Sequence, residues 1–238
     1  AVASRVRDID SQLNAIDTEV NQRLRSSVDE INGFANRIAE LNKAIGEATG
    51  ANPTVAVPAG YQQGDLLVLV ASIALGGTAT TPTGWTLLLG QVTSPRIYVY
   101  YKFATGSEAS VALTASSTTN TVVMMAYRGV SATDTISTTA SATSTTIATN
   151  TLTTTYANEY VVSVFSMTTG AATWTAPAST TTRVNSSGTA ALSGLLIVDE
   201  SQAAAGVSTA RTATSSVSKL LAANSFSIIP SGRYWVGG

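Results

Sequence analysis

Hydrophobic residues recur every three or four positions along the first 45 residues of the chain. From Val2 to Val20 the intervals between them are 4, 3, 4, 3 and 4, the heptad pattern of a helix that packs along one apolar seam. An 11-residue step leads from Val20 to Ile31, where the rhythm resumes. The pattern predicts a long N-terminal helix whose seam contains Val2, Val6, Ile9, Leu13, Ile16, Val20, Ile31, Ile38, Leu41 and Ile45.

The residue types along this seam favour an oligomer. If Val6 occupies an a position, the first three d positions carry the β-branched residues Val2, Ile9 and Ile16. β-Branched residues at d disfavour parallel dimers and favour trimers or tetramers. We therefore expect a coiled coil and a homotrimer, while a single amphipathic helix packed on its own domain is the alternative that the same pattern allows.

Beyond Pro53 the helical period disappears and strand-like runs take its place. Clusters of Gly, Pro, Thr and Ser separate these runs at the spacing typical of sandwiches and jelly rolls. The predicted strands cover 53–58, 64–75, 84–91, 95–104, 108–115, 120–128, 147–155, 158–168, 180–186, 190–199, 206–214 and 218–229.

The two halves of this β region repeat one another. The run Asp65–Ser72 aligns with Glu159–Ser166 at an offset of 94, and Pro82 aligns with Pro177 at 95. Two further runs align at an offset of 98: Tyr98–Tyr101 with Leu196–Asp199, and Val122–Met125 with Leu220–Ala223. Loop insertions between matched strands would produce such a growing offset, although Thr- and Ser-rich sequence also aligns with itself by chance.

These patterns predict a mainly β protein with a helical extension. The expected fold is a jelly-roll-like antiparallel β-sandwich with internal pseudo-duplication, preceded by a long N-terminal coiled-coil helix. The expected divisions are a helical stalk over 1–49, a β body over 50–232, and a tail over 233–238 that could begin a further module.

Charge divides the chain at the same place. Residues 1–50 hold 14 of the 27 Asp, Glu, Lys and Arg residues, and the remaining 188 positions hold 13. The formal net charge of −1 gives no electrostatic footprint for nucleic acid. The longest apolar run, Leu66–Ala71, is far short of the ~20 residues that span a bilayer, so no membrane insertion is expected.

The composition argues against catalysis. The chain has no histidine and no cysteine, which excludes a Ser–His–Asp triad, thiol chemistry and most zinc sites. Only Asp199 and Glu200 are adjacent among the body carboxylates, and adjacent strand residues point to opposite faces. We expect no enzyme activity, no metal site and no cofactor.

One strand offers a candidate ligand surface. Alternation over 96–103 places Ile97 and the other apolar residues on a core face, and a mixed aromatic and cationic set on the opposite face. Tyrosines flanked by cations can stack sugar rings, although a solvent face or a face packed on another subunit is the competing interpretation. The candidate surface consists of Arg96, Tyr98, Tyr100 and Lys102.

Seven short motifs of turns and strand cores lie along the β body: Val57–Gly60, Gly64–Val68, Pro82–Leu87, Tyr100–Lys102, Ala126–Val130, Asp199–Glu200 and Ala203–Gly206. Together they resemble a β-sandwich domain of phage tail and virion-associated structural proteins over residues 54–229. Because the motifs are structural, the resemblance implies a structural role on a virion surface and no catalytic residues.

The helical segment resembles a second family. The stretch over 28–45, with Val28–Gly33 followed by Ile38–Lys43, is similar to the helical core of flagellar hook-associated proteins. This resemblance implies an extracellular bacterial appendage.

Three functions compete on these grounds. The main hypothesis is a virion structural protein, a phage tail fibre, adhesin or decoration protein that displays the β body on an oligomeric helix. Its expected partners are capsid or tail proteins and a glycan of the host surface, and its location is the virion surface or the extracellular space. The alternatives are a flagellar hook-associated-like appendage component and a carbohydrate-binding module.

Overall fold

The computed structural model describes residues 5, 10, 12–27, 46–74, 76–91, 93–189 and 191–231. The chain divides into two units, Ala1–Glu40 and Leu41–Gly238. In the first unit, residues 12–27 are helical, as are Arg5 and Asp10. The expected tail over 233–238 lies outside the described residues, as do the seam residues Val2, Val6, Ile9, Ile31, Ile38, Leu41 and Ile45.

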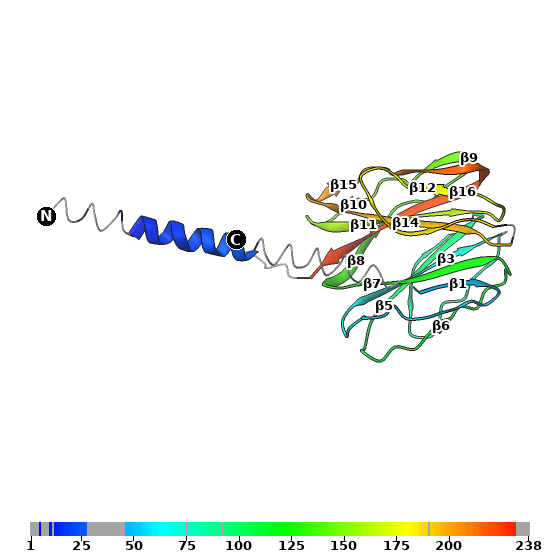
Figure 1. Cartoon of the computed structure of the whole chain (residues 1–238), viewed down its shortest axis with the longest axis horizontal. Helices are drawn as coiled ribbons and strands as arrows, with labels where there is room; N and C mark the ends of the chain where they lie inside the picture. Colours follow the sequence, from blue (N-terminus) through cyan, green and yellow to red (C-terminus); the bar gives the residue numbers. More distant parts are fainter. Residues whose placement is uncertain are drawn as a thin grey trace. The chain divides into compact units, whose positions relative to one another are not determined.

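Two antiparallel sheets form the second unit (Figure 1). The first sheet has the strand order β1-β7-β3-β5-β4. Its members are β1 (Gly46–Gly50), β3 (Leu66–Ile73), β4 (Thr86–Gly90), β5 (Arg96–Phe103) and β7 (Asn120–Tyr127).

The second sheet is built around the 19-residue strand β16. Its path runs β12-β16-β11-β14-β13, and both β8 and β9 also pair with β16. Its members are β8 (Val130–Ile136), β9 (Ala140–Ala148), β11 (Glu159–Met167), β12 (Trp174–Thr175), β13 (Thr181–Ser186), β14 (Gly194–Gln202) and β16 (Thr212–Pro230). Two short ladders, β2 (Thr54–Val55) with β6 (Val111–Ala112) and β10 (Thr153–Thr154) with β15 (Gly206–Val207), complete the elements.

A mainly β, antiparallel fold with an N-terminal helix is confirmed, while several strand boundaries differ from expectation. Strand β1 lies within the range expected to be helical, and it instead pairs with β7 at the end of the first sheet. Strands β8 and β12 and most of β9 were not predicted. The Ser- and Thr-rich sequences of β8 and β9 lack the apolar alternation that marks a half-buried strand, and β12 has only two residues. The predicted strand over 206–214 contains β15 and the start of β16, and β16 continues without a break through the last predicted strand, 218–229.

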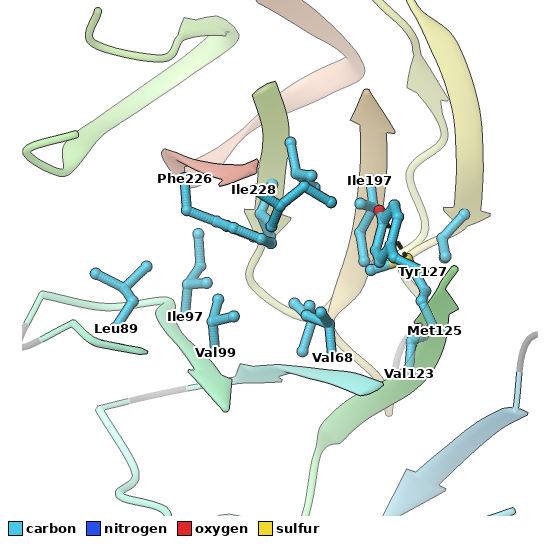
Figure 2. Close-up of a cluster of buried hydrophobic side chains, with 14 of the residues drawn as sticks. Val68, Leu89, Ile97, Val99, Val123, Met125, Tyr127, Ile197, Phe226 and Ile228 are labelled. Carbon is cyan, nitrogen blue, oxygen red and sulfur yellow. Dashed lines mark hydrogen bonds between the residues drawn. The ribbon is translucent and has the colours of Figure 1, made fainter. Parts of the chain in front are cut away.

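The two sheets pack face to face through a shared hydrophobic core. Figure 2 shows side chains of the first sheet, such as Val68 and Val99, opposite Ile197, Phe226 and Ile228 of the second. Most of these residues occupy alternate positions of their strands, as a sheet with one face in this core requires.

Each sheet also buries its outer face. Leu67, Leu69 and Ala71 of β3 point away from the shared core and pack with Val55, Trp85 and Leu113 in a second cluster. In the other sheet Phe165, Leu196 and Leu221 pack with Trp174 and Ile147 in a third. Strands β3 and β7 are consequently buried at every position.

The same pairings recur in both halves. In the first sheet Leu66 pairs with Phe103. Their counterparts in the second sheet, Tyr160 at an offset of 94 and Ser201 at an offset of 98, also pair with each other. The entry turns also agree, since Gly64 and Asn158 both have positive φ and their N–H groups donate to Ala104 and Gln202.

The outer strands repeat one another as well. The β4–β5 ladder shifts register between Leu87 and Leu89, and the β13–β14 ladder shifts at the corresponding place, between Thr182 and Val184. Thr182 and Val184 each lie 95 positions after their counterparts, Leu87 and Leu89.

The expected match of Val122–Met125 with Leu220–Ala223 is wrong by three residues. Ala71 pairs with Val122, and Phe165, which corresponds to Ala71, pairs with Ala223. The true counterpart of the first run is therefore 223–226. The Ala- and Ser-rich sequence of β16 offers no distinctive residue to fix this alignment, so only the strand pairing decides it.

Corresponding residues of the two halves meet between the sheets. Ser72 ends the inner face of β3 and Ser166 ends that of β11, and their hydroxyl oxygens lie 2.5 Å apart in a buried hydrogen bond. Nearby, Thr121 Oγ1 donates to the carbonyl of Ser193, and Ser193 Oγ donates to that of Ser72. A polar contact thus joins the two halves at one end of their apolar interface.

We predict that Ser72 and Ser166 are energetically coupled. Replacing either one by alanine leaves the other hydroxyl buried without its partner, which should lower the free energy of unfolding by about 1–3 kcal/mol. The S72A/S166A double variant removes both polar groups and should lose less than the sum of the single losses. Urea unfolding of the three variants measures this, and additive losses would contradict the coupling.

Candidate assembly site

The described helix carries a stripe of exposed hydrophobic side chains. Leu13, Ile16, Val20 and Leu24 follow one another at intervals of 3, 4 and 4, which places them on one face. Their exposed fractions are 58, 58, 55 and 61%. Leu13, Ile16 and Val20 belong to the predicted seam, and we call these four residues the helix stripe.

Polar contacts on this helix are local. Glu19 and Arg23 form an ion pair at 2.6 Å, one turn apart in the favourable order, and Thr18 Oγ1 donates to the carbonyl of Asn14. Both members of the ion pair are exposed, so its contribution to stability is small. A short isolated helix is marginal in water, and burial of an apolar face supplies most helical stability in proteins. The helix stripe is therefore the part of this segment that is suited to a partner.

The proposed ligand surface on β5 is buried. Tyr100 is fully buried and Tyr98 is 9% exposed, and their rings stack with centroids 6.2 Å apart. Both pack in the outer cluster of the first sheet. The alternation of β5 was predicted correctly, but the segments around β2 and β6 cover the face that was expected to be open.

Of the two cations on this face, Lys102 is engaged, whereas the Arg96 Nε is buried without a hydrogen-bond partner among the described residues. Lys102 Nζ lies 2.5 Å from Glu108 and 5.9 Å from the centroid of the Trp85 ring. Burial opposes ionisation of Glu108, but hydrogen bonds from Lys102 and Thr105 outweigh it and lower the pKa of that carboxyl. Arg96 is half-buried. The two tyrosines of the predicted surface therefore present almost no ring surface to solvent.

We predict that Tyr100 acts as a core residue. Tyr100→Ala should lower the free energy of unfolding by about 3–5 kcal/mol, as for other large aromatic core residues. Its hydroxyl has no hydrogen-bond partner among the described residues, so Tyr100→Phe should be neutral or stabilising. The matched control is Tyr61→Phe, because the Tyr61 hydroxyl accepts from the Glu108 N–H at 2.6 Å and its removal should destabilise. Urea unfolding distinguishes these outcomes, and a large loss in Tyr100→Phe would contradict the assignment.

Most charged groups in the described part of the β body form internal ion pairs. Asp65 pairs with Arg128 at 3.0 Å, Asp199 pairs with Arg183 at 2.6 Å, and Arg211 forms two hydrogen bonds with Glu200. Burial raises the pKa of Asp199, although Arg183 and the hydroxyl of Tyr127 stabilise its charge. Such pairs hold neighbouring segments together rather than presenting charge to a ligand.

The structure brings together one carboxyl pair that sequence reasoning missed. Glu159 begins β11, is fully buried, and accepts from the Tyr156 N–H at 2.6 Å. Its Oε2 has no hydrogen-bond partner among the described residues, and it lies near Asp134 of β8, whose Oδ2 accepts from the Thr155 N–H. These carboxyls are 25 positions apart in the sequence, so adjacency could not reveal them.

Comparison of the halves explains how Glu159 differs from its counterpart. Asp65 accepts from the Gln62 N–H in the same way, and the guanidinium of Arg128 neutralises it. The strand pairing aligns Val122 with Ala223, 101 positions later, so the counterpart of Arg128 in the second half is Ile229. Burial and the neighbouring Asp134 together raise the pKa of Glu159, although hydrogen bonds from Ser227 and Tyr156 oppose the rise.

We predict that Glu159→Gln stabilises the protein above the ordinary range of Glu titration. A raised pKa in the folded state means that the native protein holds this proton more tightly than the unfolded chain does. The contribution of Glu159 is therefore present at low pH and lost as pH rises through its folded pKa. The variant should melt at a higher temperature than the wild type at pH 8, with the difference disappearing below about pH 4.

Asp65→Asn is the matched control, because the equivalent carboxyl has a cationic partner. This variant should melt below the wild type at pH 8, since it leaves Arg128 without its counter-ion. A Glu159→Gln variant that also melts lower at pH 8 would show that the Glu159 charge is stabilised in the fold.

Groups suited to other chemistry are few. In the described part of the chain, no three Asp or Glu side chains gather in a way that could hold a metal ion. No described helix has the length and apolarity required to cross a membrane.

Comparison with known families gives one match. Residues 1–57 match the flagellar hook-associated protein FlgK helical domain. This segment includes the helix stripe and the strands β1 and β2, and it extends the similarity expected over 28–45. Comparisons with curated proteins and with solved structures gave no match.

Proposed function

We propose that this protein is a non-enzymatic structural component of an extracellular bacterial appendage. In this proposal the N-terminal segment packs against helices of neighbouring subunits, and the β body is the part displayed on the outside. The observation that carries the proposal is the exposed helix stripe within a segment similar to a flagellar hook-associated helical domain.

The β body supports a structural role in two ways. Its charged groups are largely committed to internal ion pairs, and its exposed positions are mainly neutral Thr, Ser and Ala. Such a surface can pack repeatedly against neighbours without electrostatic repulsion. The repeated pairings of the two halves support a single pseudo-duplicated β-sandwich of jelly-roll type as its architecture.

The family match favours the appendage over the phage fibre. The expected fibre, adhesin and decoration roles, together with capsid or tail partners, rest on the resemblance of the β body alone, and no family match covers the rest of that body. The surface that was expected to bind a host glycan is also not exposed, because Tyr98 and Tyr100 are buried.

The two structural hypotheses predict different behaviour of the purified full chain. A fibre protein would form a stable trimer through a continuous coiled coil. An appendage component should be a monomer with little helix at low protein concentration. As the concentration rises, the helix content and the mass of the sedimenting species should increase together, without a plateau at three copies. Circular dichroism at 222 nm and sedimentation velocity across a concentration series measure both, and a stable trimer would contradict the appendage.

The helix stripe should govern this association. We predict that the I16D/V20D variant abolishes the concentration-dependent rise, because it places charge in the apolar interface. Gln22 lies about half a turn away from the stripe, so Q22D adds a charge to the same helix and should associate like the wild type. Equal association of I16D/V20D and Q22D would exclude the stripe as the interface.

A further inference from the structure

Glu159 is buried at a place where the fold supplies no positive charge. Its side chain is fully buried, and Oε1 accepts from the Tyr156 N–H at 2.6 Å, whereas Oε2 has no hydrogen-bond partner among the described residues. In the described part of the chain, no Lys or Arg forms an ion pair with Glu159. Because an unpaired buried charge is costly, buried carboxylates in proteins are paired or coordinate metals.

A second carboxyl lies near the first. Asp134 of β8 is half-buried, and its Oδ2 accepts from the Thr155 N–H at 2.9 Å. Its side chain lies near that of Glu159, and it too has no ion pair with a described Lys or Arg. Two neighbouring carboxyl groups repel one another when both are ionised, so a shared proton or a bound cation is needed to join them.

The equivalent carboxyl of the first half shows how this position is neutralised. Arg128 donates from Nε and Nη2 to the two carboxylate oxygens of Asp65. The residue at the Arg128 position of the second half is Ile229, which has no charge. The second half therefore keeps the buried carboxyl, has Asp134 close to it, and lacks the cation.

We propose that Glu159 and Asp134 bind a calcium ion, which takes the place of the Arg128 guanidinium in this half of the body. Calcium prefers oxygen ligands, and it accepts irregular geometry and water among its roughly six to eight ligands. Asp134 is half-buried, and Thr155 and Tyr156 are exposed, so water can reach the ion and complete its shell. Magnesium is less suited, because it requires near-ideal octahedral geometry.

Such an ion would hold three segments together. Glu159 begins β11, Asp134 lies in β8, and the N–H groups of Thr155 and Tyr156, which follow β10, already donate to these two carboxyls. Two carboxylates completed by water make a weak site, in the ~10⁻⁴–10⁻³ M range of extracellular calcium modules. This inference does not depend on the proposed function, because every group in it belongs to the β body.

Thermal unfolding of the full chain at pH 8, in EDTA and in excess CaCl2, tests the site. A ligand at about ten times its dissociation constant should raise the melting temperature of a body of this size by about 3–6 °C. NaCl at equal ionic strength should give no comparable rise, and MgCl2 should give a smaller one. Glu159→Gln and Asp134→Asn each remove one charged ligand, so neither variant should respond to calcium.

Two further variants test the comparison of the halves. Asp65→Asn is the matched control, because the carboxyl that it removes is neutralised by Arg128, and it should keep the wild-type response to calcium. Ile229→Arg places a guanidinium at the position equivalent to Arg128, so it should remove the response while both carboxyls remain. A full response in Ile229→Arg would refute the equivalence of the ion and the guanidinium on which the proposal is stated.

Direct binding provides a measurement that is separate from stability. Calorimetric titration of the folded wild type with CaCl2 should show a binding event that is absent from Glu159→Gln. If the wild type melts at the same temperature in EDTA and in CaCl2, the two carboxyls hold only a shared proton and the proposal is overturned. A Glu159→Gln variant that keeps the full calcium shift would overturn it as well, because the ion would then bind elsewhere.

Discussion

The β body depends on the burial of both faces of its central strands. Every residue of β3 is buried, and all but one of β11. A strand of this kind must be covered twice, because each face carries apolar side chains that water would otherwise contact. The shared core covers the inner faces, and segments within each half cover the outer faces. Neither sheet could satisfy this requirement alone, which explains why the two halves form one body.

This double burial also determines where polar groups are found. Hydroxyl groups fill the interior positions that are not apolar, as at Ser72 and Ser166, where they bond to one another across the sheets. The carboxyls at the strand entrances need a counter-ion or a proton, and the two halves differ here. Asp65 has Arg128, whereas Glu159 has Asp134 and a raised pKa. Most of the remaining charge is used in similar internal pairs, and the exposed surface is left neutral.

On the proposed function, the neutral surface and the apolar helix stripe both suit a protein that acts through contacts with other subunits. The similarity of residues 1–57 to a flagellar hook-associated helical domain is consistent with that role. On the proposed function, the helix stripe contributes the apolar burial of these contacts.

Features that arise from local periodicity could be predicted from the sequence. The three-and-four spacing through Leu13, Ile16 and Val20 identified a helix with one apolar face, and apolar runs such as Leu66–Ala71 identified the central strands. The echo of Asp65–Ser72 in Glu159–Ser166 anticipated the repeated pairing, because strongly apolar strands align with little ambiguity. Strand β8 and most of β9 were not predicted, since their Ser- and Thr-rich sequences have no such pattern.

Which strand faces are covered, and which distant groups meet, depends on how the whole chain folds. Alternation assigned Tyr98 and Tyr100 to one face of β5, but the cover over that face comes from other segments of the chain. In the same way, Glu159 meets Asp134 because β8 and β11 both pair with β16. Local periodicity depends on residues close together in the chain, so it can be recognised within one stretch of sequence. Burial and charge pairing depend on residues that only the folded chain brings into contact.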